Sequence, residues 1–316
     1  MTSIVAPGDR IGFLGPSGTF TEEALRSDAS LVVGDLVALP SFVDVLTAVA
    51  GGAVEHGFVA IENSIEGTVN ITVDQLVFDR ELMITHEVVL PVTQNLLVTP
   101  GAELADIRRV VSFPHATGQC RGWLAEHLPG VEEVAATSTA EAVRLVGAEH
   151  ERATAAIGPA LAASIYGLEV AARGIEDHAD NATRFVLVSP PTAGVPAPSG
   201  HDKTSVVCFQ SSDHPGSLHG ILGQFSARDI NLVKLESRPT KNALGDYCFL
   251  IDFEGHVGDE VVADCLRELH ATQARVKFLG SYPAAGEHGP AIRRDVSQRW
   301  KAAQDWITGI QSLVRQ

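Results

Sequence analysis

Residues 183–209 read TRFVLVSPPTAGVPAPSGHDKTSVVCF, and this stretch decides how the chain is divided. Two apolar runs, Phe185–Val188 and Lys203–Phe209, predict β-strands because β-branched and aromatic residues dominate them. Proline, glycine and other small residues dominate the stretch between them, which has no periodic apolar face. Such a composition is typical of a linker, so we expect residues 190–202 to join one domain over residues 10–189 to another that begins at Lys203.

The first three residues of this stretch are Thr183, Arg184 and Phe185, which place a hydroxyl, a fixed positive charge and a ring at the start of a strand. No base that could activate the hydroxyl as a nucleophile lies beside it in the sequence. Because hydroxyl nucleophiles need such a base, the pattern favours a site that binds anions and moves protons over one that transfers acyl groups.

Residues 10–189 alternate short apolar runs with helical patterns, which predicts an α/β domain with largely parallel strands. The predicted strands are Ile11–Leu14, Leu36–Leu39, Phe58–Ile61, Val110–Ser112, Val134–Thr137, Ala155–Ile157 and Phe185–Val188. The predicted helices begin near Thr21, Phe42, Val73, Ala116, Thr139 and Pro159. A long β-like stretch, Leu82–Thr99, can leave one lobe for another, and Thr183–Val188 can return. Two crossings predict two lobes with a ligand-binding cleft between them.

Residues 203–283 change in character and follow the order βαββαβ, which is the ferredoxin-like pattern. The predicted strands are Lys203–Phe209, Asn231–Ser237, Tyr247–Phe253 and Val276–Leu279, and the predicted helices are Pro215–Arg228 and Asp259–His270. Residues 284–316 predict a polar loop and a helix over Val296–Val314, an extension without a chemical signature.

Composition excludes several classes of protein. The net charge of −16 argues against a nucleic-acid or anionic-membrane partner, and no apolar run is long enough to cross a membrane. The start of the sequence has no signal-peptide pattern, and the four cysteines have no zinc-type spacing, so we expect a cytoplasmic protein with reduced thiols and no metal. Residues 1–202 contain no lysine, which excludes a Schiff-base or Walker A lysine from the first domain.

Two polar segments follow predicted strands of the first lobe. Gly15–Glu22, GPSGTFTE, opens a helix, with Thr19 and Glu22 as a possible capping box, and a helix N-terminus can bind an anion. Asn63, Ser64 and Gly67 lie at the carboxyl end of the next strand, where open α/β sheets bind ligands. An ordinary βα turn and a solvated loop are the alternatives for these two segments.

The second lobe offers Ser112, His115 and Gln119, which can face one ligand from a strand end and the helix that follows. His115 can be a base, but a lone histidine is more often a capping or surface residue, so both interpretations stay open. The acidic residues near Thr183 lack the regular spacing of oxygen ligands, and we interpret them as loop charges.

The second domain has two segments suited to a free amino acid. Gly216, Ser217 and Leu218 open a helix that can take a carboxylate, and Asn231 and Glu236 at a strand can take an ammonium. A turn and an exposed salt bridge are the alternative.

Taken together, the segments resemble the prephenate dehydratase family over nearly all of residues 10–283. The catalytic-domain motifs occur in the family's order, and the second domain resembles its regulatory ACT domain. The segments that carry the likeness are Gly15–Phe20, Ile61–Val69, Ser112–Cys120, Ser138–Ala140, Ala162–Leu168, Asn181–Phe185, Glu236–Pro239 and Leu279–Pro283. Ser217, Phe113 and His115 differ from the residues that are common in the family. The family's fused chorismate-mutase helices are absent, which implies a monofunctional enzyme.

The resemblance implies a two-lobed catalytic domain like that of periplasmic binding proteins and a decarboxylating dehydration of prephenate to phenylpyruvate, carbon dioxide and water. That reaction belongs to L-phenylalanine biosynthesis and needs no cofactor. Thr183 is the implied catalytic residue, which would assist departure of the ring hydroxyl. The implied substrate-contact residues are Thr19, Phe20, Asn63, Ser64, Gly67, Ser112, His115, Gln119, Arg184 and Phe185, although Phe185 fits packing better than chemistry.

The resemblance also implies feedback inhibition by L-phenylalanine, bound between ACT domains of a homodimer or homotetramer. The residues near this effector would be Gly216, Ser217, Leu218, Asn231, Leu232, Glu236, Ser237 and Arg238. Two alternatives stay open: arogenate dehydratase, which performs the same elimination on an amino acid, and a non-enzymatic two-lobed amino-acid sensor.

Overall fold

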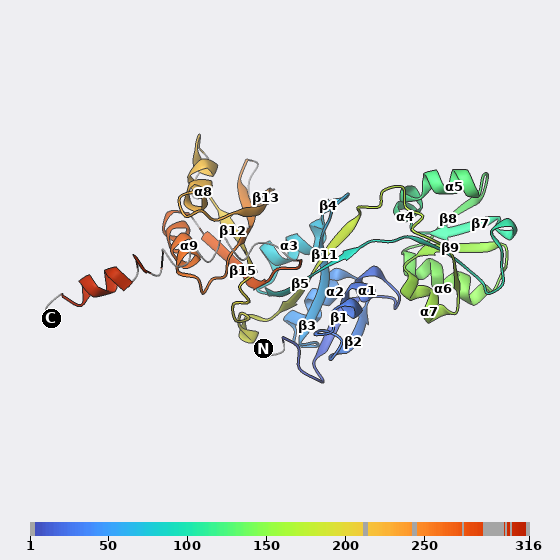
Figure 1. Cartoon of the computed structure of the whole chain (residues 1–316), viewed down its shortest axis with the longest axis horizontal. Coiled ribbons are helices and arrows are strands. Elements are labelled where there is room, and N and C mark those ends of the chain that lie inside the picture. Colours follow the sequence, from blue (N-terminus) through green and yellow to red (C-terminus); the bar gives the residue numbers. More distant parts are fainter. Residues whose placement is uncertain are drawn as a thin grey trace. The chain divides into compact units, whose positions relative to one another are not determined.

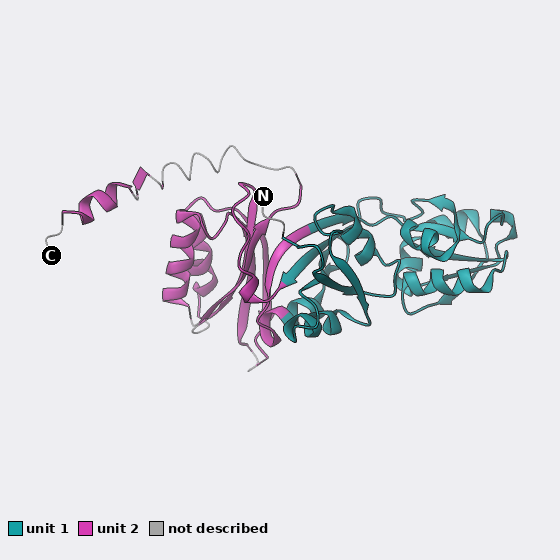
Figure 2. Ribbon diagram, turned by 90° about the horizontal axis from the view of Figure 1, so that it is seen from below, with its two compact units in different colours: residues 1–75, 88–188 teal, residues 76–87, 189–316 magenta. Residues whose placement is uncertain are grey.

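The computed structural model describes residues 4–210, 214–241, 245–273, 275–286, 300, 302–303 and 305–313. The chain separates into two compact units (Figure 2). Unit 1 comprises Met1–Gln75 and Val88–Val188, and unit 2 comprises Leu76–Glu87 and Ser189–Gln316. No helix among the described residues has the length and apolar character needed to span a bilayer.

The first lobe of unit 1 is a mixed sheet in the order β2-β1-β3-β11-β5, with β4 paired to the end of β3 (Figure 1). Its strands are β1 (Arg10–Leu14), β2 (Asp35–Leu39), β3 (His56–Asn63), β4 (Gly67–Thr68), β5 (Met83–Pro91) and β11 (Ala182–Ser189). Its helices are α1 (Phe20–Ser27), α2 (Phe42–Ala50) and α3 (Asn70–Asp74). Strands β1, β2 and β3 are parallel, whereas β11 runs antiparallel to β3. The long stretch that was expected to leave the lobe thus begins as a strand of its sheet.

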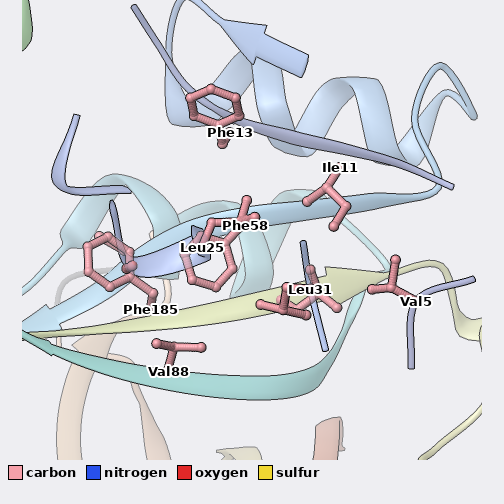
Figure 3. Close-up of a cluster of buried hydrophobic side chains, with 11 residues drawn as sticks. Val5, Ile11, Phe13, Leu25, Leu31, Phe58, Val88 and Phe185 are labelled. Atoms are coloured by element: carbon pink, nitrogen blue, oxygen red, sulfur yellow. The ribbon is translucent and has the colours of Figure 1, made fainter. Parts of the chain in front are cut away.

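The core of this lobe lies between α1 and one face of the sheet. Ile11, Phe13 and Phe58 of the sheet belong to one buried cluster with Leu25 of α1 (Figure 3). Phe185 belongs to the same cluster and stacks on Phe58, with ring centroids 5.4 Å apart and planes inclined by 11°. Burial of an aromatic side chain contributes roughly 1.5–3 kcal/mol, so Phe185 stabilises the strand on which Thr183 lies.

The second lobe of unit 1 has a five-stranded sheet in the order β10-β6-β9-β7-β8. Its strands are β6 (Asn95–Val98), β7 (Arg109–Ser112), β8 (Glu132–Ala135), β9 (Thr154–Gly158) and β10 (Glu169–Arg173). Its helices are α4 (Pro114–Gln119), α5 (Arg121–His127), α6 (Thr139–Glu149) and α7 (Ala160–Tyr166), with a 3-10 turn at Leu104–Asp106. Helix α5 covers one face, and α6 and α7 cover the other (Figure 1).

Strands β7, β8 and β9 are parallel, but β6 and β10 add an antiparallel edge. The predicted α/β class is confirmed, and the pairing is more mixed than expected. The reason is that β6, β10 and β11 flank the two crossings between the lobes and join the sheets as antiparallel strands.

The predicted βαββαβ order of unit 2 is confirmed. Its elements are β12 (Asp202–Phe209), α8 (Ser217–Ser226), β13 (Leu232–Pro239), β14 (Tyr247–Glu254), α9 (Glu260–Thr272) and β15 (Arg275–Pro283), preceded by a 3-10 turn at Pro191–Ala193. The sheet order is β13-β14-β12-β15, and every pair is antiparallel. Both helices pack on one face around Phe225, Phe253 and Cys265. Helix α8 begins at Ser217 rather than at the predicted Pro215, because Gly216 with φ of 92° ends the preceding turn. In the C-terminal extension, residues 300, 302–303 and 305–311 are helical.

A short segment of the first half of the chain packs in unit 2. Helix α3 continues directly into a π-helix, η1 (Gln75–Asp79), and residues from Leu76 to Glu87 belong to unit 2. The buried ammonium of Lys277 donates to the carbonyl oxygens of Arg80 (2.7 Å) and Val77 (3.4 Å). A side chain at Gly280 would meet the carbonyl oxygen of Ile84, since a Cβ there would lie 2.1 Å from it. These contacts fix the segment against β15.

Candidate functional site

Asn63 and Thr183 lie opposite each other at the ends of two paired strands. Their backbones are register partners in the β3–β11 ladder. The Asn63 amide nitrogen donates to the Thr183 hydroxyl oxygen at 2.9 Å and to the Asn181 side-chain oxygen at 2.7 Å. The ladder therefore brings together two of the predicted site residues, which are 120 positions apart in the sequence.

The orientation of the Asn63 amide is fixed by its own loop. Its oxygen accepts the backbone N–H groups of Ile65 (3.0 Å) and Glu66 (2.9 Å), which turns the nitrogen toward Thr183. The Thr183 hydroxyl is thus an acceptor toward Asn63, and its own proton points elsewhere. The described residues offer that proton no acceptor within hydrogen-bond distance. A half-buried hydroxyl with an uncommitted proton can donate to a leaving group.

A bulge in β11 lies between Arg184 and Phe185, and the two side chains have different surroundings. The register of β11 against β3 shifts between Arg184 and Phe185, and such bulges redirect side chains beside active sites. Arg184 is 9% exposed and lies 3.4 Å from the carboxylate of Glu62. Phe185 is 2% exposed in the core. The packing role favoured for Phe185 is thus what the structure shows, and Arg184 has a partner that sequence reasoning missed.

Helix α4 brings Gln119 and His115 of the second lobe to the same region of unit 1. The Gln119 amide nitrogen lies 2.8 Å from His115 Nε2, and that ring nitrogen lies 2.9 Å from a carboxylate oxygen of Glu66. Asn181 donates to the Gln119 oxygen at 3.5 Å. Asn63, Thr183, Gln119 and His115 are therefore linked through Asn181 and Glu66, two residues that were not predicted as site residues.

The polar side chains of the segment Gly15–Glu22 form hydrogen bonds with groups that are close in the sequence. Thr19 caps α1 as predicted: its hydroxyl oxygen accepts the Glu22 N–H and donates to the Leu14 carbonyl. The buried Glu22 carboxylate accepts the N–H of Gly18 at 2.7 Å, instead of the Thr19 N–H of a full capping box. Gly18 has φ of 90°, and a Cβ there would lie 3.0 Å from the Ala162 backbone of the second lobe. This segment contacts α7, and Phe20 packs against the first core.

The remaining predicted residues divide into backbone supports and exposed positions. The Ser64 hydroxyl accepts the Ala182 N–H (2.9 Å) and donates to the Asp180 carbonyl (3.2 Å), so it fixes the loop before Thr183. The fully buried Ser112 hydroxyl donates to the Ile157 carbonyl on the neighbouring strand. Gly67 is exposed, with φ of 80°.

The groups around Cys120 decide its chemistry. Cys120 follows Gln119 at the junction of α4 and α5 and is fully buried. Burial raises the pKa of its thiol to about 12, and the carboxylates of Glu176 and Asp177 contribute to the increase. A thiol must ionise to act as a nucleophile, so Cys120 is inert at neutral pH. The carboxylate of Asp177 accepts the N–H groups of Gly122 and Trp123, in agreement with a role as a loop charge.

The predicted effector residues of unit 2 surround the start of α8 and strand β13. Gly216 is the N-cap of α8, and the hydroxyl of Ser217 accepts from Gln210 at 2.8 Å. Glu236 lies 2.7 Å from Arg238 and 3.7 Å from Lys234. The other members of this set are Leu218 in α8, the exposed Asn231 before β13, Leu232 at its start and Ser237 within it.

Family comparisons match both units. A model of the prephenate dehydratase family matches residues 11–193, and a model of the ACT domain matches residues 204–271. The chain belongs to the prephenate dehydratase family. This membership confirms the activity class, a decarboxylating hydro-lyase of aromatic amino-acid biosynthesis, and the C-terminal ACT domain, both predicted from the motifs.

Individual relatives agree with the family. A prephenate dehydratase of Mycobacterium leprae (strain Br4923) is 43% identical over 304 residues, 93% of each chain. The solved structure of an Arthrobacter aurescens prephenate dehydratase in complex with L-Phe gives a TM-score of 0.85 at 39% identity and covers 96% of this chain and 99% of that one. A protein described as a novel type of quorum quenching acylase gives a TM-score of 0.79 at 32% identity over 87% and 98% of the two chains. The specific likeness to periplasmic binding proteins stays a prediction.

Proposed function

We propose that unit 1 converts prephenate to phenylpyruvate, carbon dioxide and water, with Thr183 donating a hydrogen bond to the departing ring hydroxyl. The observation that carries this assignment is the 2.9 Å contact in which Asn63 donates to Thr183, because it leaves the threonine proton for another acceptor. The family and the M. leprae relative support the substrate.

The reaction balances with one proton. The bond between the ring and its carboxylate breaks to release carbon dioxide, the electron pair enters the ring, and the carbon–oxygen bond of the hydroxyl breaks as the ring becomes aromatic. The leaving hydroxide takes up one proton to become water. Threonine is a very weak acid, so Thr183 assists by hydrogen bonding, and the proton comes ultimately from solvent. Acid assistance of this kind contributes typically ~10²–10⁴-fold.

The neutral character of the site suits this chemistry. Acceleration requires interactions that strengthen in the transition state, and a strong cation on the ring carboxylate would oppose its loss as neutral carbon dioxide. Asn63, Gln119 and Thr183 are neutral, and Arg184, which follows Thr183, lies near the Glu62 carboxylate. We assign Asn63 and Gln119 to substrate contact, Thr19, Ser64 and Ser112 to support of the segments around them, and Arg184 to charge balance. Phe20, Gly67 and His115 stay predicted contacts, and we assign Phe185 to packing of the core.

We assign the regulatory role to unit 2, with L-phenylalanine as effector between ACT domains of a homodimer or homotetramer. The L-Phe complex of the Arthrobacter relative supports the ligand. Two apolar side chains on the edge strand β13, Val233 and Leu235, are more than 40% exposed and suit burial against a second copy. We place the effector near Gly216–Leu218 and the β13 residues named above.

The segment Leu76–Glu87 suits transmission of the effector signal. It lies inside the residues that match the catalytic family, yet it packs in unit 2. Glu87 is 3% exposed, with its carboxylate 2.7 Å from Lys203 and 2.9 Å from the Ala285 N–H. The chain runs from this segment through α3 to the loop that orients Asn63. A ligand that favours one arrangement of unit 2 can therefore bias the site through this segment.

We assign residues 10–189 to the catalytic domain, 190–202 to the linker, 203–283 to the ACT domain and 284–316 to an extension, with residues 76–87 as a catalytic-domain segment that packs on the ACT domain. A cytoplasmic location stays a prediction from composition.

The deciding experiment measures phenylpyruvate formation from prephenate, with and without L-phenylalanine. We expect turnover and its inhibition by L-phenylalanine. Higher turnover of arogenate than of prephenate would favour arogenate dehydratase instead. No product from either substrate, with amino-acid binding intact, would overturn the enzyme assignment in favour of a sensor. An acyl-amide substrate serves as a control, and we expect no hydrolysis because Cys120 is protonated and Thr183 accepts from an amide rather than donating to a base.

A further inference from the structure

The two chain crossings between the lobes of unit 1 meet at Gln94 and Asn181. The Val92 N–H donates to the Asn181 carbonyl at 2.8 Å, and the Ile175 N–H donates to the Gln94 carbonyl at 3.0 Å. Glu176 accepts the Gln94 N–H at 2.7 Å. Both amide side chains are 3% exposed. The two crossings therefore carry two buried amides beside the proposed site.

Both side chains reach Gln119. The Asn181 nitrogen and the Gln94 nitrogen each lie 3.5 Å from the Gln119 side-chain oxygen. On its other side, the Asn181 oxygen accepts from Asn63 at 2.7 Å. Asn181 thus bonds a residue of the first lobe and a residue of the second, and Gln94 supports the second contact.

In the network of Asn63, Asn181 and Gln119, the donor and the acceptor of each hydrogen bond are fixed. The Asn63 oxygen is committed to two backbone N–H groups, so Asn63 must present its nitrogen to Asn181. Asn181 must then present its oxygen to Asn63 and its nitrogen to Gln119. Gln119 in turn presents its oxygen to Asn181, and its nitrogen lies 2.8 Å from His115 Nε2. The order of orientation thus runs from Asn63, whose own loop also turns its nitrogen toward Thr183, to Asn181 and then to Gln119.

The side chain of Gln94 lowers the stability of the folded state. Its side-chain oxygen is buried and has no hydrogen-bond partner in the part of the chain that the structure describes. A buried amide oxygen without a partner destabilises a fold, and an apolar side chain of the same size would avoid that cost. Residues that are kept against stability occur at functional sites.

We propose that Asn181 and Gln94 are positioning residues, which act from the two crossings to tie the Asn63 side chain, already oriented by its own loop, to Gln119 of the second lobe and so hold both amides in place beside Thr183. This inference rests on the proposed function. Asn181 holds the oriented Asn63 nitrogen in place through its side-chain oxygen, and Gln94 keeps the Gln119 oxygen turned toward Asn181.

The test compares Gln94→Met and Asn181→Leu with the wild-type chain by kcat, KM for prephenate and melting temperature. Gln94→Met is expected to lower kcat about 3–10-fold, the loss that one neutral hydrogen bond gives, with KM nearly unchanged and a melting temperature equal or higher. Asn181→Leu is expected to lower kcat about 10–100-fold, because it removes two hydrogen bonds. A merely structural role would lower the melting temperature and leave kcat of the folded fraction intact.

Asn95 provides a matched control, since it is a neighbouring buried amide whose oxygen also lacks a partner among the described residues. Its nitrogen donates to the carbonyls of Thr93 and Gly158 and makes no contact with the network. Asn95→Leu should change stability and leave kcat near that of the wild type.

A double-mutant cycle tests the route of action. If Asn181 acts through Thr183, Asn181→Leu should cost little further turnover in a Thr183→Val background. Wild-type kcat in Gln94→Met, or full additivity in the cycle, would overturn the inference while the proposed function stands. A wild-type chain that forms no phenylpyruvate would overturn both. If Asn181→Leu does not fold, the kcat and melting temperature of Gln94→Met decide the matter.

Discussion

Replacement of Thr183 by valine separates the hydroxyl from the shape of the side chain. Valine is nearly isosteric with threonine and suits a strand, so β11 keeps its pairing with β3. Asn63 loses one acceptor but keeps the Asn181 oxygen at 2.7 Å and the Ala182 carbonyl at 3.3 Å, so no buried donor is left unpaired. Because a neutral hydrogen bond contributes about 0.5–1.5 kcal/mol, the free energy of unfolding should fall by no more than about 1.5 kcal/mol.

The effect on catalysis should be far larger than the effect on stability. Loss of acid assistance is expected to lower kcat ~10²–10⁴-fold, equivalent to about 3–5 kcal/mol in the activation barrier. The assay is initial-rate formation of phenylpyruvate from prephenate, alongside denaturant unfolding of the same samples. Thr183→Ser is the matched control: it keeps the hydroxyl and should retain activity within about 10-fold, since only the restriction from the methyl group is lost.

A folded Thr183→Val enzyme that turns over within a few-fold of the wild type would refute the reasoning. It would show that the hydroxyl oriented by Asn63 is not the group that assists departure of the leaving hydroxide.

Three further predictions concern the core, regulation and pH. Phe185→Ala should lower the free energy of unfolding by about 3–5 kcal/mol, measured by denaturant unfolding, because the ring is buried and stacked; a loss below about 1 kcal/mol would contradict its place in the core. Lys277→Met should weaken inhibition by L-phenylalanine at least several-fold and leave uninhibited kcat unchanged, because it frees residues 76–87 from β15, whereas an unchanged inhibition curve would exclude that segment as the route. Burial raises the thiol pKa values of Cys120, Cys208 and Cys265 to about 12, so the folded state binds more protons than the unfolded state above pH 9. Stability should therefore fall as pH rises from 9 toward 12, by about 1.4 kcal/mol per thiol at pH 10, and equal unfolding midpoints at pH 8 and pH 10 would contradict this.

Local patterns were sufficient for much of the fold. The composition of residues 190–202 predicted the boundary between the domains, and alternating apolar residues predicted the βαββαβ order that the structure shows. Thr19 was predicted to cap a helix and does so, since capping depends on neighbouring residues alone. The antiparallel pairing of β6 and β10 was not predicted, because strand pairing depends on partners that are distant in the sequence.

The residues of the candidate site also divide into those that local sequence predicted and those that it did not. Asn63, Gln119 and Thr183 were identified from their positions at strand and helix ends and from the family resemblance. Asn181 and Gln94 were not assigned as site residues, because a buried amide in a crossing segment has no local signal that distinguishes it from a loop residue.

The sequence by itself determined the α/β class of the first domain, the βαββαβ order of the second and the family, and it predicted a domain boundary and the hydroxyl expected to take part in the reaction, because all of these depend on residue types and short spacings. The tertiary structure alone decided that this hydroxyl accepts a hydrogen bond, since its donor, Asn63, is distant in the sequence and is linked through Asn181 to Gln119 of the second lobe. It also decided that residues 76–87 pack in unit 2, because the shape of Gly280 and the buried charge of Lys277 matter only once β15 lies against that segment.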